Sequence, residues 1–361
     1  RKVYPPRGRA KAKVAVVDLS LTVRKAECFG FLGVNGAGKT STLAVLTGDT
    51  LPTSGGAWVE GRSVLTNLTA VRHRLGYCPQ FDPLLELMTA RETLTMFARL
   101  KSVDEAAIPS LVQELIDHVS LTPYADRVCG SYSGGNKRKL SLAIALVGAP
   151  AVVFLDEPSS GMDPLSRRHM WEVITEERSR RCIVLTTHSM EEAEALCSRI
   201  AIMAAGRLQC LGGQQHLKSK YGGGYALELR CAPPRVAAAR AAVARLFEGA
   251  REIEHHAGKL KFELPSEKDG GGSLAGVFET LEAQKEELGV EDYSASQPTI
   301  EDIFLKIAGE KDLEAAARGT SARAAAPAPA PEVEAVEMMR PSGEMKVVVA
   351  TPMPLEDPLT V

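Results

Sequence analysis

The stretch that decides the fold of this 361-residue chain reads Gly33-Val34-Asn35-Gly36-Ala37-Gly38-Lys39-Thr40. An apolar strand pattern at 27–32 precedes it, and a helical pattern at 41–46 follows it. In this setting glycines let backbone N–H groups turn inward around phosphate oxygens, and the new helix adds positive potential at its N-terminus. A chance match in a glycine-rich turn is the alternative, which the flanking strand and helix disfavour. The sequence therefore predicts a phosphate-binding P-loop.

Polar side chains at the end of this loop and of a later strand supply the expected chemistry. Lys39 would reach the β- and γ-phosphates of a nucleotide, the Thr40 hydroxyl would ligate Mg²⁺, and Ser41 would donate to the α-phosphate. A buried strand pattern further on ends in Asp156 and Glu157. In P-loop enzymes the first such carboxylate holds Mg²⁺, and the second can accept a proton from the attacking water. A strand that merely ends in an acidic turn is the alternative.

A histidine follows another buried strand pattern, 182–186, and would emerge at the carboxyl end of that strand. Parallel strands would bring this residue, His188, to the same sheet edge as Gly33, Gln80 and Asp156. Ligands bind at that edge in open α/β folds. A structural role is the more usual one for a lone histidine, but this position favours a functional role.

One helix start carries more positive charge than its dipole favours. Residues 133–136 read Ser-Gly-Gly-Asn, and Lys137, Arg138 and Lys139 fill the first turn that follows. Cations at a helix N-terminus are unfavourable, and an anion docked on the Ser-Gly-Gly turn would relieve the conflict. The alternative is an ordinary capped helix with a solvated basic turn.

Length and composition place the chain among globular proteins of about two domains. Hydrophobic residues make up 45% and charged residues 24%, and 43 Lys+Arg nearly balance 45 Asp+Glu. A net charge of -2 gives no reason to expect a nucleic-acid partner. The longest uncharged run, 140–155, is shorter than a membrane span and is interrupted by glycine and proline. The seven cysteines show no Cys-x-x-Cys pair, which argues against a zinc site.

Three regions are expected along the chain. Residues 1–220 alternate strand and helix patterns, as in a mostly parallel α/β sheet, with an all-helical subdomain at about 81–145. Residues 221–309 follow the order β-α-β-β-α-β, which predicts a small ferredoxin-like α+β domain, and a short helix at 300–307 follows. The Ala/Pro-rich tail, 310–361, is expected to be disordered.

Together these stretches resemble the nucleotide-binding domain of ABC transporters, a P-loop NTPase fold. Residues 33–40 resemble its Walker A motif, and Asp156 with Glu157 its Walker B motif and catalytic glutamate. Other matches are the Q-loop glutamine, the signature loop, the D-loop aspartate and the switch histidine, at Gln80, Ser133-Gly134-Gly135, Asp163 and His188. Several linked motifs in the family's order are far more specific than one P-loop.

The individual residues within the motifs, together with the small domain at 221–309, are similar to those of subfamily A, the large lipid exporters. Asn136 replaces the glutamine commonest across the superfamily, as is usual in subfamily A. Tyr4 falls where the family has the aromatic ring that stacks on adenine. The resemblance implies ATP and Mg²⁺ as ligands, with Thr40, Gln80 and Asp156 toward the metal. Gln80 and His188 would also sense the γ-phosphate, while Glu157 orients the water.

The same resemblance implies a cytosolic position on a membrane transporter that hydrolyses ATP to move lipids. Two nucleotide-binding domains would meet head to tail, so that the signature loop of each covers the ATP on the P-loop of the other. Transmembrane domains of the same transporter would be the second partner. Near Gln80, four apolar residues form either a groove for a membrane-domain helix or part of the helical core: Phe81, Leu84, Leu85 and Met88.

Two other classes of protein share some of these motifs. A soluble ABC ATPase acting on DNA or ribosomes would carry the same site. DNA-repair types, however, insert a long coiled coil that does not fit between Lys39 and Tyr132, and ribosomal types carry two such domains in one chain. A nucleotide-binding module without hydrolysis is the other alternative, and Glu157 argues against it because degenerate sites commonly lose that carboxylate.

Overall fold

The computed structural model describes residues 1–6, 12–222, 224–256, 258–265, 274–288 and 290–307. The chain divides into two compact units, one ending at Leu211 and the other covering Gly212–Glu310. Helix α8 (Gln214–Tyr221), which the sequence analysis grouped with the first domain, therefore belongs to the second unit. The expected disordered tail at 310–361 lies outside the described residues.

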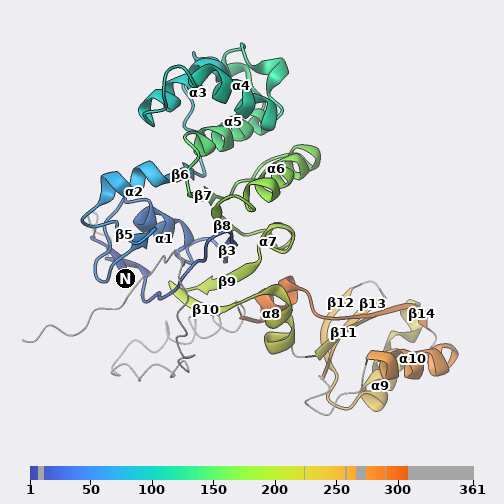
Figure 1. Cartoon of the computed structure of the whole chain (residues 1–361). Coiled ribbons are helices and arrows are strands. Elements are labelled where there is room, and N and C mark those ends of the chain that lie inside the picture. The colour runs from blue at the N-terminus through green and yellow to red at the C-terminus, as the bar shows by residue number, and fades with distance from the viewer. Residues whose placement is uncertain (7–11, 223, 257, 266–273, 289, 308–361) are drawn as a thin grey trace, which may run out of the picture. The chain divides into compact units, whose positions relative to one another are not determined.

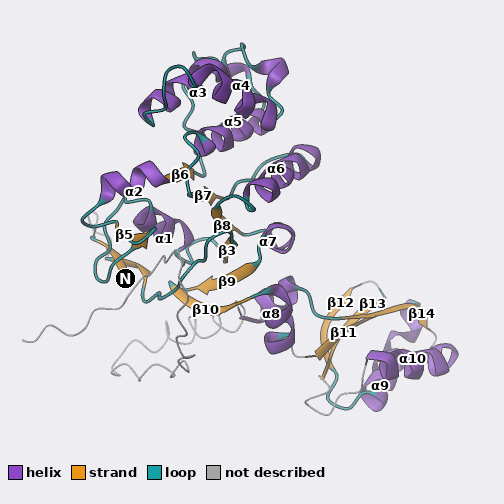
Figure 2. Cartoon of the chain, in the orientation of Figure 1, coloured by secondary structure: helices purple, strands orange, loops and turns teal. Residues whose placement is uncertain are grey.

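The first unit is built on a six-stranded sheet with the order β10-β9-β3-β8-β7-β6 (Figure 2). Strands β6, β7, β8, β3 and β9 pair in parallel. The strand patterns expected at 27–32, before Asp156 and at 182–186 all form, because each is a run of apolar residues buried on both faces of the sheet. The bounds of the strands are β3 Cys28–Leu32, β6 Leu75–Cys78, β7 Val152–Asp156, β8 Cys182–Thr187, β9 Arg199–Ala204 and β10 Arg207–Gly212.

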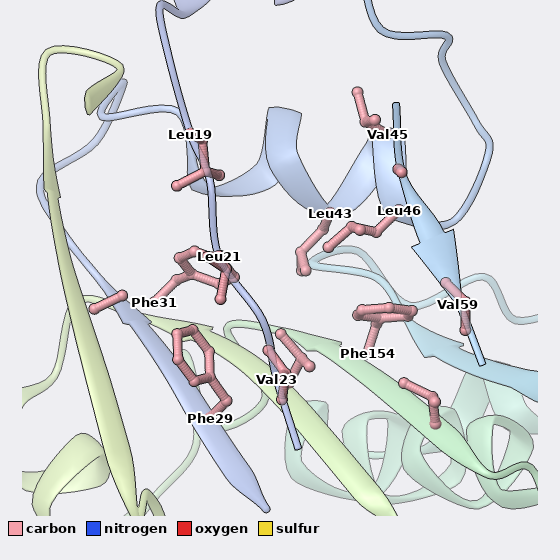
Figure 3. Close-up of a cluster of buried hydrophobic side chains, with 14 of the residues drawn as sticks. Leu19, Leu21, Val23, Phe29, Phe31, Leu43, Val45, Leu46, Val59 and Phe154 are labelled. Atoms are coloured by element: carbon pink, nitrogen blue, oxygen red, sulfur yellow. The ribbon is translucent and has the colours of Figure 1, made fainter. Parts of the chain in front are cut away.

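Aromatic and branched side chains from this sheet form the core of the first unit (Figure 3). The rings of Phe29 and Phe31 meet edge to face with centroids 5.1 Å apart, a favoured aromatic geometry. Leu43 and Leu46 of helix α1 (Lys39–Leu46) pack into the same cluster, as does Phe154 of β7. This packing fixes α1 and the loop before it against the sheet.

Two short antiparallel strand pairs and further helices complete the first unit. The pairs are β1 (Lys2–Tyr4) with β2 (Lys13–Val16), and β4 (Trp58–Val59) with β5 (Arg62–Ser63). The remaining helices are α2 Leu68–Arg74, α3 Ala90–Leu100, α4 Ile108–His118, α5 Gly134–Leu146, α6 Pro164–Glu177 and α7 Met190–Leu196.

Helices α3, α4 and α5 pack against one another at one end of the unit (Figure 1). A capping box starts α3: the Thr89 hydroxyl accepts a hydrogen bond from the Glu92 backbone N–H at 3.2 Å, and the Glu92 carboxylate accepts one from the Thr89 backbone N–H at 2.8 Å. The all-helical region expected after Gln80 therefore has the local signals and the packing that the sequence indicates.

The second unit has the expected ferredoxin-like order of elements. After α8 come β11 Gly224–Cys231, α9 Val236–Leu246, β12 Arg251–His256, β13 Lys259–Pro265, α10 Leu274–Leu288 and β14 Val290–Ser296. The strands form one antiparallel sheet, β12-β13-β11-β14. Alternate residues of the strands, such as Leu227, Leu229 and Phe262, pack with α9 and α10 in its core. The short helix expected at 300–307 also forms. Each described helix, in either unit, falls short of the length and hydropathy that a bilayer span needs.

Candidate functional site

The loop at 33–38 delivers the start of α1 to the carboxyl edge of the sheet. Gly38 adopts φ 108°, and a Cβ there would come within 2.5 Å of the Ala15 carbonyl oxygen, so only glycine fits. Lys39 follows as the first residue of α1 and is only 5% exposed. Its Nζ donates to the carbonyl oxygens of Gly33 at 2.6 Å and Val34 at 3.3 Å. The lysine thus lies folded over the loop that the sequence assigns to phosphate.

Burial lowers the pKa of Lys39 from its ordinary value, while the nearby charges of Glu157 and Asp156 oppose that shift. A desolvated ammonium with two acidic neighbours is stabilised by any additional anion placed beside it. The electrostatics of the loop therefore favour a phosphate ligand.

A cavity of about 340 Å³ opens in front of the loop. Most of its lining comes from the predicted site, and the full set is Lys13, Ala15, Asn35, Gly36, Ala37, Gly38, Lys39, Thr40, Ser41, Gln80 and Glu157. Lys13 and Ala15 are additions that the sequence analysis missed. They lie on β2, and only the fold brings that strand beside the loop.

Oxygen atoms suited to Mg²⁺ meet at one side of this cavity. The Thr40 hydroxyl donates to Asp156 Oδ1 at 3.3 Å, and the buried Thr186 hydroxyl also donates to Oδ1. Among the described residues, the buried Asp156 Oδ2 has no hydrogen-bond partner. A hydroxyl beside a carboxylate with a free oxygen fits a hard cation such as Mg²⁺, which prefers oxygen ligands and keeps several waters.

Two residues from separate strand ends contact the carboxylate of a third, Glu157. Glu157 Oε2 accepts a hydrogen bond from Gln80 Nε2 at 3.2 Å, and Oε1 lies 3.3 Å from His188 Nδ1. Glu157 is 8% exposed, while the His188 side chain is 58% exposed. Parallel β6, β7 and β8 end at the same edge, which is why residues far apart in the sequence meet there.

Tyr4 lies next to the loop. Its hydroxyl donates to Ser41 Oγ at 3.4 Å, and the strand pairing sets Tyr4 opposite Lys13 of the cavity lining. Lys2 Nζ stands 4.8 Å from the Tyr4 ring centroid, close enough for a cation–π contact. The aromatic ring proposed for adenine is therefore held beside the cavity by β1.

The signature loop and the D-loop aspartate lie together elsewhere. Ser133 caps α5 by accepting from the Asn136 backbone N–H at 3.3 Å, and Asp163 caps α6 through the backbone N–H groups of its first turn. A Cβ on Gly135 would come within 3.7 Å of Asp163 Oδ2. Neither group belongs to the described lining of the cavity. The structure thus brings these predicted nucleotide contacts near each other and not to the P-loop of the same chain.

The sequence predicts that the cations at 137–139 lie beside a docked anion or in solvent, and this prediction is wrong for Arg138. Arg138 is 3% exposed and turns inward, where it donates to backbone carbonyl oxygens instead of facing an anion or solvent. Lys137 pairs with Glu86 at 3.7 Å, and burial lowers the pKa of Lys139. The charge pattern of a single helix turn could not show which of its side chains points inward.

The apolar residues after Gln80 are partly open to solvent. Phe81 is 82% exposed and Leu85 is 53% exposed, whereas Leu84 and Met88 are half-buried. Two of the four are therefore substantially exposed, as a docking groove requires and a buried helical core does not.

The comparisons with known proteins agree with this geometry. A family model described as "ABC transporter" matches residues 16–160, and a model described as "ABCA1-like, C-terminal R1 regulatory domain" matches residues 222–297. The ATP-binding cassette sub-family A member 7 of Rattus norvegicus is 50% identical over 305 residues, which cover 84% of this chain. The chain belongs to subfamily A of the ABC transporters.

Other subfamily A members align over similar lengths. The phospholipid-transporting ATPase ABCA3 of Homo sapiens is 48% identical over 82% of this chain, and the retinal-specific phospholipid-transporting ATPase ABCA4 of Homo sapiens is 46% identical over 86%. The chain spans only 14% of the length of the rat sub-family A member 7, 17% of ABCA3 and 14% of ABCA4. This subfamily A chain thus corresponds to a small part of much longer proteins.

Solved structures share the fold of this ABC domain. A dimeric ATP-binding cassette in a post-hydrolysis state bound to ADP and Pi superimposes with a TM-score of 0.55 at 20% identity, covering 59% of this chain and 95% of that one. An ATP binding subunit of an ABC transporter gives a TM-score of 0.55 at 25% identity, covering 61% of this chain and 92% of that one. The chain therefore contains a P-loop ATPase fold, which these structures match over about 60% of its length.

Proposed function

We propose that this chain binds ATP at the cavity around Lys39 and hydrolyses it, driving transport by the ABC transporter to which it belongs. The observation that carries the proposal is the Glu157 carboxylate, held by Gln80 and His188 at the rim of a P-loop. A buried carboxylate aimed into a phosphate site is the arrangement that general-base hydrolysis needs. Two relatives are named phospholipid-transporting ATPases, which makes phospholipid the favoured transported substrate.

The chain's own groups divide the work of phosphoryl transfer to water. Lys39 would exchange its two carbonyl partners for β- and γ-phosphate oxygens, while the N–H groups at the start of α1 bind the same phosphates. Glu157 would orient a water molecule and accept its proton as the water oxygen attacks the γ-phosphorus, giving ADP and inorganic phosphate. Gln80 and His188 would hold the Glu157 carboxylate in the orientation that it needs to accept this proton.

Thr40 and Asp156 are the residues that would hold Mg²⁺, with Gln80 as a further oxygen donor. When bound, this ion neutralises phosphate charge and fixes the orientation of the triphosphate. Tyr4 would stack on the adenine, since its hydroxyl already contacts Ser41 of the loop. Ser41 would then donate to the α-phosphate.

A second nucleotide-binding domain would complete each site. The signature loop and the D-loop aspartate lie outside the cavity lining, and they would instead contact the nucleotide of the partner: Ser133, Gly134, Gly135 and Asp163. A likeness to two solved cassettes described as dimeric supports a head-to-tail pair. ATP would then act as the contact between the two domains, so nucleotide would favour dimerisation by mass action.

The exposed Phe81 and Leu85 would receive the membrane domains of the same transporter, on the cytosolic face of the membrane. Their place directly after Gln80 would couple that contact to the γ-phosphate. The regulatory-domain match at 222–297 favours this transporter over the soluble ABC ATPase that the motifs alone left open. We expect no nucleic-acid partner.

Phosphate release by the purified chain tests the proposal. ATP with Mg²⁺ should yield steady ADP and phosphate, slowly for a lone domain, and a metal chelator should abolish the release. The negative control is Lys39→Met, which removes the phosphate-binding charge and keeps a side chain of similar length. Phosphate release that is absent in the native chain, or equal in the Lys39→Met chain, would overturn the assignment.

A further inference from the structure

A single buried guanidinium joins the two chain segments that carry the proposed catalytic groups. Arg138 is the fifth residue of α5 and donates to five backbone carbonyl oxygens and one carboxylate. Nε donates to Pro158 O at 2.9 Å. Nη1 donates to Pro79 O, and to Gln80 O and Asp82 Oδ1 at 3.3 Å each. Nη2 donates to Asp156 O at 2.6 Å and to Glu157 O at 3.0 Å. All three guanidinium nitrogens are therefore engaged.

The backbone at Glu157 is the part of the site that most needs such support. Glu157 has φ 50°, a left-handed conformation that costs free energy for a residue with a side chain. Such conformations persist only where neighbouring groups hold them in place. The Glu157 N–H donates to Thr186, to its hydroxyl and to its carbonyl oxygen, each at 3.1 Å, and the Glu157 carbonyl accepts from Arg138. The strained residue is thus held on both sides of its peptide unit.

The charge and shape of the side chain both suit this role. Taking a full charge out of water is costly, and the carbonyl dipoles together with the Asp82 carboxylate offset that cost. Asp82 is held in turn by the Ser141 hydroxyl at 2.8 Å. Only arginine presents five N–H donors in a planar fork, and a lysine has three donors at one point.

We propose that Arg138 is a positioning residue for hydrolysis, which sets the carboxylate of Glu157 and the amide of Gln80 at their working distance. This inference rests on the ATPase function proposed above. Arg138 touches neither side chain but binds the backbone carbonyl of each. Ser133 caps the same helix turn, so a displacement of the signature loop by a partner domain would reach Glu157 through Arg138.

Substitution of Arg138 in the full chain tests this role. Arg138→Met keeps the apolar stem and removes every donor. Arg99→Met is the matched control, since Arg99 is an exposed arginine of α3 that pairs with Glu105. We expect turnover at saturating ATP to fall about 10- to 100-fold in Arg138→Met, the range typical for loss of a group that orients an active-site ligand. ATP affinity should stay unchanged, because the hydrogen-bond acceptors of Arg138 lie at 79–82 and 156–158 and neither on Lys39 nor on the loop at 33–38. Arg99→Met should retain normal turnover.

Non-additivity separates positioning from a general loss of structure. If Arg138 acts through Glu157, the double variant Arg138→Met/Glu157→Gln should turn over no more slowly than Glu157→Gln alone. Amide hydrogen exchange at Asp156 and Glu157 should be faster in Arg138→Met than in the native chain. Arg138→Lys, which keeps the charge and can be used if the methionine variant does not fold, should show the same selective loss of turnover.

Three outcomes would overturn the inference. They are native turnover in Arg138→Met or Arg138→Lys, an additive loss in the double variant, and loss of ATP affinity in parallel with turnover. A native chain that releases no phosphate would instead refute the proposed function itself. Faster amide exchange at Asp156 and Glu157 in Arg138→Met would still support the role of Arg138 in holding this backbone.

Discussion

Replacement of Glu157 by glutamine removes the proposed base with the least change in shape. Glu157 is 8% exposed, and its two oxygens face Gln80 and His188. The amide of Glu157→Gln fills the same volume and can still accept a hydrogen bond from Gln80 through its oxygen. It cannot take a proton from water. The variant should therefore lose the catalytic role of the carboxylate and little else.

The expected loss follows from the size of general-base catalysis. A positioned base contributes roughly 10²- to 10⁴-fold in rate, which corresponds to about 3–5 kcal/mol of activation free energy. ATP binding should be equal or tighter, because a negative charge beside the γ-phosphate is removed. Phosphate release under saturating ATP and equilibrium titration with a fluorescent ATP analogue measure the two quantities separately.

The matched control is Glu114→Gln, an exposed carboxylate on α4. This change should leave both phosphate release and nucleotide affinity at native values. Hydrolysis by Glu157→Gln at a rate close to that of the native chain would refute the assignment of Glu157 as the base. An equal loss of affinity and of turnover would also contradict it, since that pattern belongs to a binding residue.

Three further results are expected. Lys39→Ala should weaken ATP binding itself, measured by calorimetry, because a charge-assisted contact to phosphate is lost, and unchanged affinity would contradict that contact. Burial lowers the pKa of Lys39 and bound phosphate should raise it again, so binding at alkaline pH should take up protons and affinity should fall as pH rises through the lowered pKa. Calorimetry in two buffers of different ionisation enthalpy should show this uptake in the native chain and not in Lys39→Ala. Glu157→Gln should sediment as a dimer with ATP and as a monomer without it. Adding Ser133→Glu to this variant should prevent dimerisation while ATP still binds. A Glu157→Gln chain that stays monomeric at saturating ATP would contradict the shared site.

Local patterns were sufficient to predict most of the sheet and the P-loop. The strands at 152–155 and 182–186 were predicted because each is apolar on consecutive positions and buried on both faces. Helix α1 was predicted at 41–46, and it begins two residues earlier, at Lys39. A shared sheet edge was predicted for Gln80, Asp156 and His188, since parallel strands end together, whereas the contacts of Gln80 and His188 with Glu157 come from the structure.

Contacts between segments distant in sequence could not be predicted in the same way. The sequence gives no sign that β2 brings Lys13 to the loop, because that placement depends on strand pairing with Tyr4. Arg138 was expected either beside a docked anion or in a solvated basic turn, since its helix turn alone does not show the carbonyl groups that it binds. Thr186 has an ordinary place at the end of a strand, and only the folded site shows its hydroxyl between Asp156 and Glu157.

The most direct measurement is the structure of the Glu157→Gln chain crystallised with ATP and Mg²⁺. We expect the triphosphate in the P-loop, with Lys39 Nζ on the β- and γ-phosphates, the Thr40 hydroxyl on the metal and the Tyr4 ring against adenine. Ser133 of a second copy should cover the γ-phosphate. A nucleotide bound elsewhere, with Lys39 still donating to the Gly33 carbonyl, would contradict it.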